Sequence, residues 1–456
     1  MTELIQKALE TATETKDIIF GNDVNKEIGP MFKRLYPDMK AIIVADDNTW
    51  GAVGEEVVKS LDEAGVEFAD EPYMFPGTPT LYGDYDNTET LREAMRPYEN
   101  TIMISLGAGT LNDIAKLAAG ELGREYINVC TAASVDGFAS FGASISKDGF
   151  KITRSCPAPA ALIMDVPTMV EAPYRLTATG YGDLIEKIPA GADWILSDEL
   201  GIEEIDDYVW ELVQSTLMES LDDPQAVRDT DPDAIAKLGE GQLMSGLAMQ
   251  AHQSSRPASG AGHQFSHVWE MEGHGLDWEP PLSHGNKVGV GTVASLAIWE
   301  EFLKLTEEDF DIDRAIERLK TPEEVEADVR SSLNENLQEE AVKHSVGKLL
   351  TEDQLRERIE LLKQKWPAIK ERCEKQNIPA KQAMDMLKTA GAPYHPEHLK
   401  VDMERFRDTH FKAQMIRPRY TVLDVLTDLG IFEDIVDKLF ADDGFWGQNP
   451  HPETDL

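Results

Sequence analysis

The stretch "TIMISLGAGTLNDIAKLAAGELG", residues 101–123, decides the fold. Its first seven residues, 101–107, combine the length of a strand with β-branched side chains. Residues 109–123 then have apolar side chains at helical spacing and end in glycine. A strand, a glycine turn and a helix in this order predict one strand–helix unit of a parallel sheet.

The same pattern continues on both sides of this stretch. "KAIIVAD" at 40–46 and "EYINVCT" at 125–131 have strand character, and 50–65 has helical spacing. A further strand-like run occupies 161–166. Strands that are apolar throughout and alternate with helices predict a parallel sheet covered on both faces. Ligands of such sheets bind at the carboxyl ends of the strands.

Beyond about residue 170 the β-type patterns end, and nearly every segment is predicted to be helical. Residues 352–376 place apolar side chains at helical spacing among dense charges, which predicts amphipathic helices with a solvated face. A chain of 456 residues exceeds one domain of usual size. We therefore predict an α/β dinucleotide-binding domain at 1–170 and a helical, metal- and substrate-binding domain at 171–456.

The composition restricts the partners. With 43 basic and 84 acidic residues, the formal charge is -41, which repels nucleic acid and anionic membranes. An anionic small ligand then needs a local positive site, and Arg256 and Lys151 are candidates for it.

The cysteines and the N-terminus indicate the compartment. The three cysteines lie far apart, which predicts neither a disulfide framework nor a thiolate metal site. The N-terminal residues lack the pattern of a signal peptide, and no apolar run reaches 18 residues. We expect a cytoplasmic protein without membrane insertion.

The turn at Gly107–Thr110 is a candidate phosphate cradle. Glycines allow a sharp turn close to a ligand, and the N-terminus of a helix, here expected at about Leu111, favours phosphate. Asn112 stands in place of the third glycine of the common dinucleotide fingerprint. The alternative is an ordinary turn in which Thr110 and Asp113 form a capping pair.

Asp46 ends the strand 40–46. A carboxylate there can accept hydrogen bonds from the ribose hydroxyls of an adenosine and disfavours a 2′-phosphate, which favours NAD. The alternative is a turn aspartate, since "DDNT" at 46–49 suits a turn.

Histidines are concentrated in one region. Five of the ten in the chain fall between 252 and 284. His263 and His267 share one face of the predicted helix, and His284 follows in "LSHGNK". These imidazoles can bind one metal together or take different roles around it. Asp183 in "GYGDLIEK" is the candidate carboxylate ligand. The alternatives are a structural histidine pair and an aspartate at a helix N-terminus.

Five motifs in order resemble the glycerol-1-phosphate dehydrogenases: "GAGTLNDIAK", "TAASVDGFAS", "GYGDLIEK", "SSRPASGAGHQFSHVWEM" and "LSHGNKVGVGT". The likeness is to the bacterial type associated with arabinose operons, within the iron-containing alcohol dehydrogenase and dehydroquinate synthase superfamily. It extends from "IIVADDNTWGAVG" to residue 430. It implies a dehydroquinate synthase-like fold, with a Rossmann-like parallel-sheet domain followed by an all-α domain.

The resemblance implies roles for individual residues. It implies metal ligation by Asp183, His263 and His284, substrate contacts from Asp136, Asp183 and His267, and catalytic roles for His267 and Asp136. The residues that it implies for the cofactor are Asp46, Gly107, Gly109, Thr110, Leu111, Asn112, Asp113, Thr131, Ala132, Ala133, Ser134 and Ser140. Two departures are visible, since Gly262 and Gln264 stand where relatives carry glutamate before the ligand histidine and sometimes histidine after it.

The implied reaction is the reversible reduction of dihydroxyacetone phosphate to sn-glycerol 1-phosphate. It would use NAD(H) or NADP(H) and one divalent ion, Zn²⁺, Ni²⁺ or Fe²⁺. A homodimer is expected from the same resemblance. The alternatives are a dehydrogenase of glycerol or another polyol, a dehydroquinate-synthase-like cyclase, and a non-catalytic binding protein.

Overall fold

The computed structural model describes residues 3–147 and 150–454, apart from the side chains of residues 3 and 150–152. The chain forms two compact units. The first unit consists of Met1–Leu184, Tyr208–Ser255 and Asp277–Pro281, and the second consists of Ile185–Asp207, Arg256–Leu276 and Leu282–Leu456. The last strand ends at Asp165, before the predicted boundary at residue 170, and the chain passes from one unit to the other more than once.

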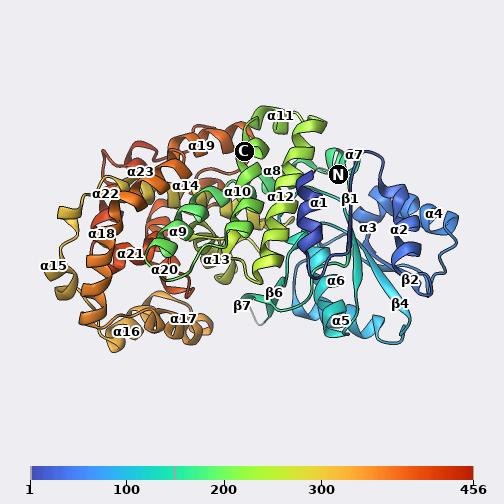
Figure 1. Ribbon diagram of the computed structural model, residues 1–456, viewed down its shortest axis with the longest axis horizontal. Helices are drawn as coiled ribbons and strands as arrows, with labels where there is room; N and C mark the ends of the chain where they lie inside the picture. The colour runs from blue at the N-terminus through green and yellow to red at the C-terminus, as the bar shows by residue number, and fades with distance from the viewer. Residues whose placement is uncertain (1–2, 148–149, 455–456) are drawn as a thin grey trace. The chain divides into compact units, whose positions relative to one another are not determined.

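The first unit is built on a parallel sheet, in which Figure 1 labels β1, β2 and β4. The strand order is β1-β8-β5-β4-β2-β3. The strands are β1 (Asp17–Gly21), β2 (Lys40–Asp46), β3 (Tyr73–Phe75), β4 (Thr101–Leu106), β5 (Tyr126–Cys130) and β8 (Ala161–Asp165). The four predicted strands correspond to β2, β4, β5 and β8, so the α/β fold class is confirmed. Because β4 lies between β2 and β5, the carboxyl ends of these three strands are neighbours.

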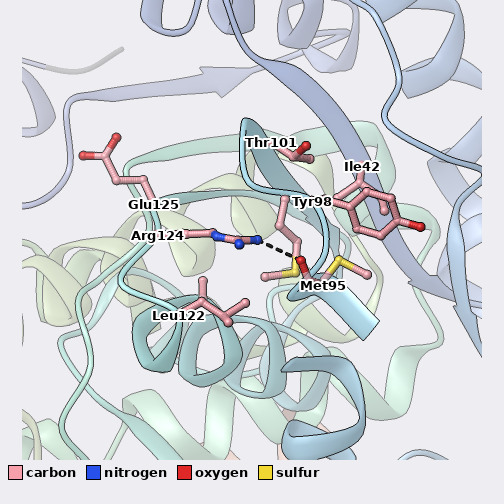
Figure 2. Close-up of a pocket in the computed structure, with 9 residues that line it drawn as sticks. Ile42, Met95, Tyr98, Thr101, Leu122, Arg124 and Glu125 are labelled. Carbon is pink, nitrogen blue, oxygen red and sulfur yellow. Dashed lines mark hydrogen bonds between the residues drawn. The ribbon is translucent and has the colours of Figure 1, made fainter. Parts of the chain in front are cut away.

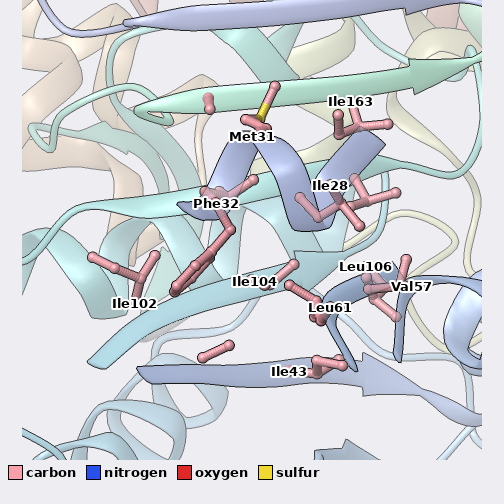
Figure 3. Packing of buried hydrophobic residues seen from close by; sticks show 14 of the residues in the cluster. Ile28, Met31, Phe32, Ile43, Val57, Leu61, Ile102, Ile104, Leu106 and Ile163 are labelled. Carbon is pink, nitrogen blue, oxygen red and sulfur yellow. The ribbon is translucent and has the colours of Figure 1, made fainter. Parts of the chain in front are cut away.

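Helices cover both faces of the sheet. On one face, α2 (Ile28–Leu35) and α4 (Glu55–Glu63) pack against the strands through buried side chains such as Phe32 and Leu61 (Figure 3). On the other face, α5 (Tyr85–Met95) and α6 (Gly109–Glu121) form a second apolar core. Both faces are buried, which explains why the strands are apolar throughout rather than alternating.

Several elements depart from the sequence pattern. The predicted helix 50–65 starts as a π-helical turn, Trp50–Gly54, before α4. The edge strands β1 and β3 are short and were not predicted, and neither was the antiparallel pair β6 (Ala143–Lys147) and β7 (Phe150–Arg154). The remaining helices that lie in this unit or begin at its border are α1 (Glu3–Thr11), α3 (Asp47–Thr49), α7 (Val166–Glu171), α8 (Tyr174–Leu184), α10 (Asp207–Leu221), α11 (Pro224–Arg228) and α12 (Pro232–His252).

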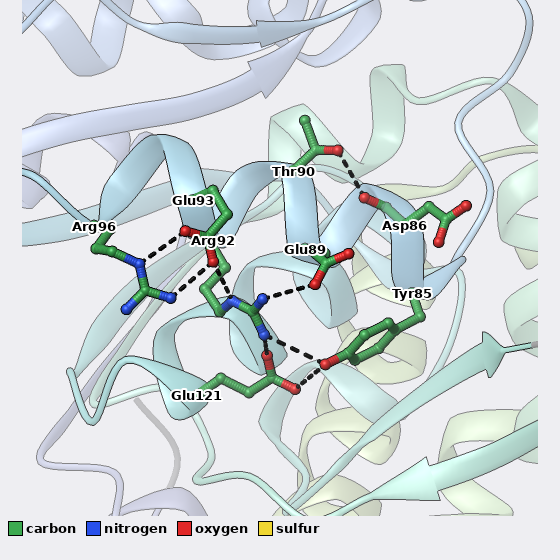
Figure 4. Close-up of polar contacts among 8 residues, drawn as sticks. All are labelled: Tyr85, Asp86, Glu89, Thr90, Arg92, Glu93, Arg96 and Glu121. Atoms are coloured by element: carbon green, nitrogen blue, oxygen red, sulfur yellow. Dashed lines mark hydrogen bonds and ion pairs between the residues drawn. The ribbon is translucent and has the colours of Figure 1, made fainter.

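Two surface features of the first unit lie away from the carboxyl edge of the sheet. A small pocket near the start of β4 is lined by Ile42, Thr101 and Arg124, whose guanidinium donates to the Met95 carbonyl (Figure 2). Arg92 of α5 forms ion pairs with glutamates of α5 and α6 (Figure 4). Exposed ion pairs of this kind are screened by water and contribute little to stability.

The second unit is helical. The predicted amphipathic segment 352–376 forms α18 (Glu352–Gln376), which buries Leu355, Leu362 and Trp366, so this prediction is confirmed. The other helices are α9 (Lys187–Glu199), α13 (Ala261–Met271), α14 (His284–Leu303), α15 (Ile312–Glu317), α16 (Pro322–Ser332), α17 (Glu335–Gly347), α19 (Ala380–Thr389), α20 (Met403–Met415), α21 (Val422–Asp428), α22 (Phe432–Phe440) and α23 (Phe445–Gln448). Across the described residues, every helix is too short or too polar to cross a bilayer.

Candidate active site

The glycine turn after β4 lies at the carboxyl edge of the sheet, where its sequence predicted a cradle. A Cβ atom on Gly107 would lie 2.8 Å from the Cβ of Leu111, so the turn into α6 requires glycine. Helix α6 begins at Gly109 without a side-chain cap. The alternative capping pair is therefore wrong, because Asp113 instead accepts a hydrogen bond from the Ser144 N–H at 3.1 Å. The uncapped N–H groups suit an anion.

Two of the predicted cofactor residues in α6 face the interior. The Leu111 side chain is buried, and the Asn112 Oδ1 accepts from the Tyr126 hydroxyl at 2.9 Å. The Asn112 N–H donates to the Ala108 carbonyl. The parts of this stretch that remain suited to a cofactor are thus the backbone from Gly107 to Thr110.

The segment after β5 carries Thr131, Ala132, Ala133 and Ser134 and lies beside that turn. Helix α8 approaches it closely, since a Cβ atom on Gly180 would lie 1.9 Å from the Ala133 carbonyl oxygen. That oxygen accepts from Gln242 Nε2 at 3.1 Å. These contacts with two helices fix the segment at the edge where the sequence placed the cofactor.

A buried lysine holds the next segment. The Lys116 ammonium donates to the carbonyls of Gly137, Ser140 and Gly142 at 2.7, 3.0 and 3.0 Å. The Ser140 hydroxyl donates to the Gly137 carbonyl at 2.8 Å. The predicted cofactor residue Ser140 therefore belongs to a loop that is tied to α6.

Asp46 is placed at the carboxyl end of β2 and caps the helical turn α3. Its Oδ1 accepts from the Thr49 N–H at 2.8 Å, while its own N–H donates to the Thr49 hydroxyl. The turn interpretation of "DDNT" is thus confirmed. Its position beside the glycine turn is the one that the ribose hypothesis requires.

Asp136 and Asp183 contact each other within the first unit. The Asp136 N–H donates to Asp183 Oδ2 at 3.0 Å, and the Ser245 hydroxyl donates to Asp136 Oδ2 at 2.7 Å. Asp183 is fully buried near the end of α8. The alternative that placed it at a helix N-terminus is therefore wrong, because α8 starts at Tyr174 and the next helix, α9, starts only at Lys187.

The three predicted histidines meet in the second unit. The ring centroids of His263 and His284 are 5.3 Å apart. The centroid of the His267 ring lies 6.0 Å from that of His263 and 5.9 Å from that of His284. His263 and His267 come from one face of α13, and His284 is the first residue of α14. The three rings thus lie together, as the helical spacing of His263 and His267 and the nearby His284 suggested in the sequence.

Two carboxylates orient two of these rings. Glu186 Oε2 lies 2.8 Å from His263 Nδ1, and Glu270 Oε1 lies 2.9 Å from His284 Nδ1. The Glu270 contact is a hydrogen bond from His284 Nδ1, so Nε2 of His284 is the nitrogen with a lone pair, whereas Glu186 faces His263 Nδ1 at ion-pair distance. This is the arrangement by which a carboxylate fixes a metal-binding imidazole. The donor set therefore fits a borderline divalent ion such as Zn²⁺.

His267 has the opposite arrangement. Arg417 donates to its Nδ1 from Nη2 at 2.9 Å and from Nε at 3.3 Å. Because a guanidinium cannot accept a hydrogen bond, Nδ1 must accept, and neutral His267 carries its proton on Nε2. Burial and the neighbouring Arg417 lower the pKa of His267 well below its ordinary value. His267 is thus a neutral N–H donor rather than a third ligand of the same kind.

Asp193 of α9 ties the segments around this cluster together. Its carboxylate accepts from the N–H groups of Ala261 and Val422 at 2.7 and 2.9 Å and from Trp299 Nε1 at 3.2 Å. Burial raises the pKa of Asp193 to about 7. Helices α9, α13, α14 and α21 are joined by this one side chain.

The departure at residue 262 has a structural basis. A Cβ atom on Gly262 would lie 2.8 Å from Cγ of Glu186, and one on Gly291 would lie 2.2 Å from the Gly262 carbonyl oxygen. Helices α13 and α14 therefore touch backbone to backbone next to His263. A glutamate at this position has no room in this chain.

The two anion-binding candidates from the sequence have different outcomes. Arg256 is fully buried and donates to the carbonyls of Asp193 and Tyr420, with Glu203 at 3.2 Å, so these contacts are structural. The side chain of Lys151 lies outside the described residues.

Sequence reasoning missed Glu186, Glu270 and Arg417. Glu270 follows His267 by three residues, a spacing that could have indicated it, whereas Arg417 is 150 positions away.

Comparison with known proteins defines the class first. A family model described as iron-containing alcohol dehydrogenase matches residues 19–173. The crystal structure of glycerol dehydrogenase from Schizosaccharomyces pombe aligns with a TM-score of 0.57 over 97% of this chain and 94% of that one, at 15% identity. The fold is that of the iron-containing alcohol dehydrogenases, as the sequence motifs predicted.

The relatives in sequence define the family. A glycerol-1-phosphate dehydrogenase [NAD(P)+] of Halalkalibacterium halodurans is 34% identical over 258 residues, which are 57% of this chain and 64% of that relative. The protein of the same name from Bacillus velezensis is 34% identical over 283 residues, 62% of this chain and 71% of that relative. The chain belongs to the glycerol-1-phosphate dehydrogenase family, whose members are NAD(P)-linked oxidoreductases.

Proposed function

We propose that the protein catalyses the reversible, NAD(P)H-linked reduction of dihydroxyacetone phosphate to sn-glycerol 1-phosphate with one divalent metal ion. The observation that carries this proposal is the pairing of His263 and His284 with Glu186 and Glu270. Two neighbouring imidazoles that each face a buried carboxylate at Nδ1 have little purpose in a protein that merely binds nucleotide. The names of the relatives supply the substrate.

The metal ligands in this proposal are His263, His284 and Asp183. Asp183 precedes Glu186 by three residues, so chain geometry keeps its Cα within about 11 Å of that of Glu186. The Asp136 N–H that donates to Asp183 Oδ2 would orient the carboxylate. A divalent ion bound there supplies a Lewis acid that polarises a carbonyl and stabilises an alkoxide.

His267 acts on the oxygen at C2 of the substrate. When a hydride arrives at C2 of dihydroxyacetone phosphate, negative charge develops on this oxygen, which then takes up a proton. In this proposal the Nε2–H of neutral His267, on the helix that also carries His263, donates a hydrogen bond to the developing alkoxide, and the proton that the oxygen takes up comes from water. Asp136, which Ser245 and the backbone hold in place, contacts the substrate in this proposal.

The dinucleotide lies along the carboxyl edge of the sheet. The uncapped start of α6 at Gly107–Thr110 binds the pyrophosphate, Asp46 contacts the ribose, and residues 131–134 and Ser140 border the cofactor. The nicotinamide supplies the hydride. We expect the active form to be a homodimer in the cytoplasm.

A direct test compares substrates and metal content. Oxidation of NADH and NADPH is followed with dihydroxyacetone phosphate and with unphosphorylated dihydroxyacetone, and bound metals are quantified by elemental analysis. We expect His263→Ala to lose both metal and activity. Turnover confined to unphosphorylated polyols or ketones would favour the polyol dehydrogenase alternative, and full activity of His263→Ala would refute the ligand assignment.

A further inference from the structure

The second unit gathers positive charge beside His267, although the whole chain is strongly acidic. Arg417 and Arg419 are separated by one residue in the motif "IRPRY" at 416–420. Arg417 contacts His267 directly, and Arg419 Nη1 donates to the Ser259 carbonyl at 2.6 Å, in the segment that leads into α13. Both guanidinium groups thus lie next to the helix that carries the histidine cluster.

Arg256 also lies within electrostatic range of Arg419. Burial and the neighbouring Arg256 and Arg417 lower the pKa of Arg419 to about 9. Burial is the main cause of this shift, and the two neighbouring cations add to it. Arg256 is already bound to Glu203 and to two carbonyls, whereas the recorded partner of Arg417 is a neutral ring.

The environment of Arg417 is unusual for a partly buried cation. In the part of the chain that the structure describes, no ion pair joins its guanidinium to a carboxylate. Glu270 attracts it from a distance but is engaged with His284 Nδ1. Withdrawing a charge from water is costly unless an opposite charge compensates it. Such a site is suited to an anion that arrives with the substrate.

We propose that Arg417, supported by the positive field of Arg419, recognises the phosphate group of the substrate. This inference rests on the proposed function and names the residue that gives the active site its preference for a phosphorylated ketone. The planar guanidinium binds phosphate oxygens with two parallel N–H groups, which Lys cannot reproduce. Its contact with His267 places phosphate recognition next to the side chain that binds the C2 oxygen in the proposed reaction, as a three-carbon substrate requires.

The test compares two substrates in one variant. Arg417→Met removes the guanidinium, and the specificity constant kcat/KM is measured for dihydroxyacetone phosphate and for dihydroxyacetone. Because a charged hydrogen bond is worth about 1.5–3 kcal/mol, the value for the phosphorylated substrate should fall at least about tenfold more than the value for the unphosphorylated one. Equal losses with both substrates would show that Arg417 only orients His267 and would overturn the proposal.

A binding measurement separates this inference from the proposed function. Inorganic phosphate should raise the melting temperature of the wild-type holoenzyme and have little effect on Arg417→Met. If the wild type fails to reduce dihydroxyacetone phosphate but keeps this Arg417-dependent stabilisation, the proposed function is wrong and the anion site stands. If the wild type turns over the substrate and the variant matches it, the anion site is refuted.

Two further variants guard against a folding artefact. Arg417→Lys retains the positive charge but lacks the two parallel N–H groups of the guanidinium. We expect an intermediate loss of kcat/KM for the phosphorylated substrate. An unchanged KM in this variant would contradict recognition by the two N–H groups. Arg407→Met is the matched control, since Arg407 of α20 pairs with Asp437 and belongs to no part of the site. It should keep the substrate preference of the wild type.

Discussion

Replacing Glu186 by glutamine tests the idea that this carboxylate fixes the metal-binding nitrogen of His263. Glu186 Oε1 accepts from the Gly260 N–H at 3.1 Å, and Oε2 lies 2.8 Å from His263 Nδ1. Glutamine has the same shape but a single acceptor. If its oxygen keeps Gly260, its NH₂ group faces Nδ1, which must then accept, and the ring proton moves to Nε2.

The expected magnitude follows from this geometry. In the other orientation of the glutamine, its NH₂ group faces the Gly260 N–H, and an unmet buried hydrogen bond costs about 1–3 kcal/mol. Loss of a partner of this kind usually lowers metal affinity about 10- to 100-fold, which is about 1.4–2.8 kcal/mol. We expect Glu186→Gln to fall in this range, with activity restored by excess metal because the ring itself is intact.

The assay is bound Zn²⁺ by elemental analysis after equilibration in chelator buffers of defined free Zn²⁺, with NADH oxidation measured in parallel. Glu272→Gln is the control, because Glu272 caps α13 and pairs with Arg405 and Lys412 rather than with a histidine. It should reduce stability and leave Zn²⁺ affinity unchanged. A Zn²⁺ dissociation constant for Glu186→Gln within twofold of the wild type would refute the reasoning.

Three other outcomes follow from the structure. His267→Asn should lower kcat about 10²- to 10⁴-fold with the metal content unchanged, and simultaneous loss of metal would argue that His267 is a ligand. Burial lowers the pKa of His410 from 6.5 to about 4. Between these pH values the unfolded chain therefore binds a proton that the folded chain does not. The free energy of unfolding should fall by up to about 1.4 kcal/mol per pH unit as the pH drops from 6.5 to 4. His410→Phe should flatten this dependence in urea titrations, and an unchanged slope would contradict the assignment. Gly180→Ala places a methyl group 1.9 Å from the Ala133 carbonyl oxygen and should lower the free energy of unfolding in urea by about 1–3 kcal/mol or more. The control Gly51→Ala meets no atom within 4 Å and should be nearly neutral. Equal effects of the two variants would refute the close approach.

The central part of the fold could be predicted because its signals are local. The strands β2, β4, β5 and β8 are continuous apolar runs, and α6 and α18 show helical spacing. The edge strand β3 has only three residues, and the apolar run of β1 is limited to residues 18–20, so neither is long enough for a pattern to develop. The π-helical turn Trp50–Gly54 has no local sequence signal of this kind; within it, a Cβ atom on Gly54 would lie 2.5 Å from the Trp50 ring.

The candidate site divides in the same way. His263 and His267 could be paired from their spacing, and Asp136 and Asp183 could each be named as site residues from family motifs, although their contact with each other could not be foreseen. The residues that set their chemistry could not, because Glu186 and Arg417 reach the rings through the tertiary fold, 77 and 150 positions away in the chain. The interpretation of Asp183 as the start of a helix failed because its local glycines suggested a break, whereas α8 runs through them.

The contact between Gly262 and Gly291 restricts how this enzyme can diverge. While α13 and α14 stay this close, only glycine fits at either position. A larger residue becomes acceptable only after the two helices have separated. A first substitution at either position therefore requires a shift in the packing of the two helices before the new side chain fits.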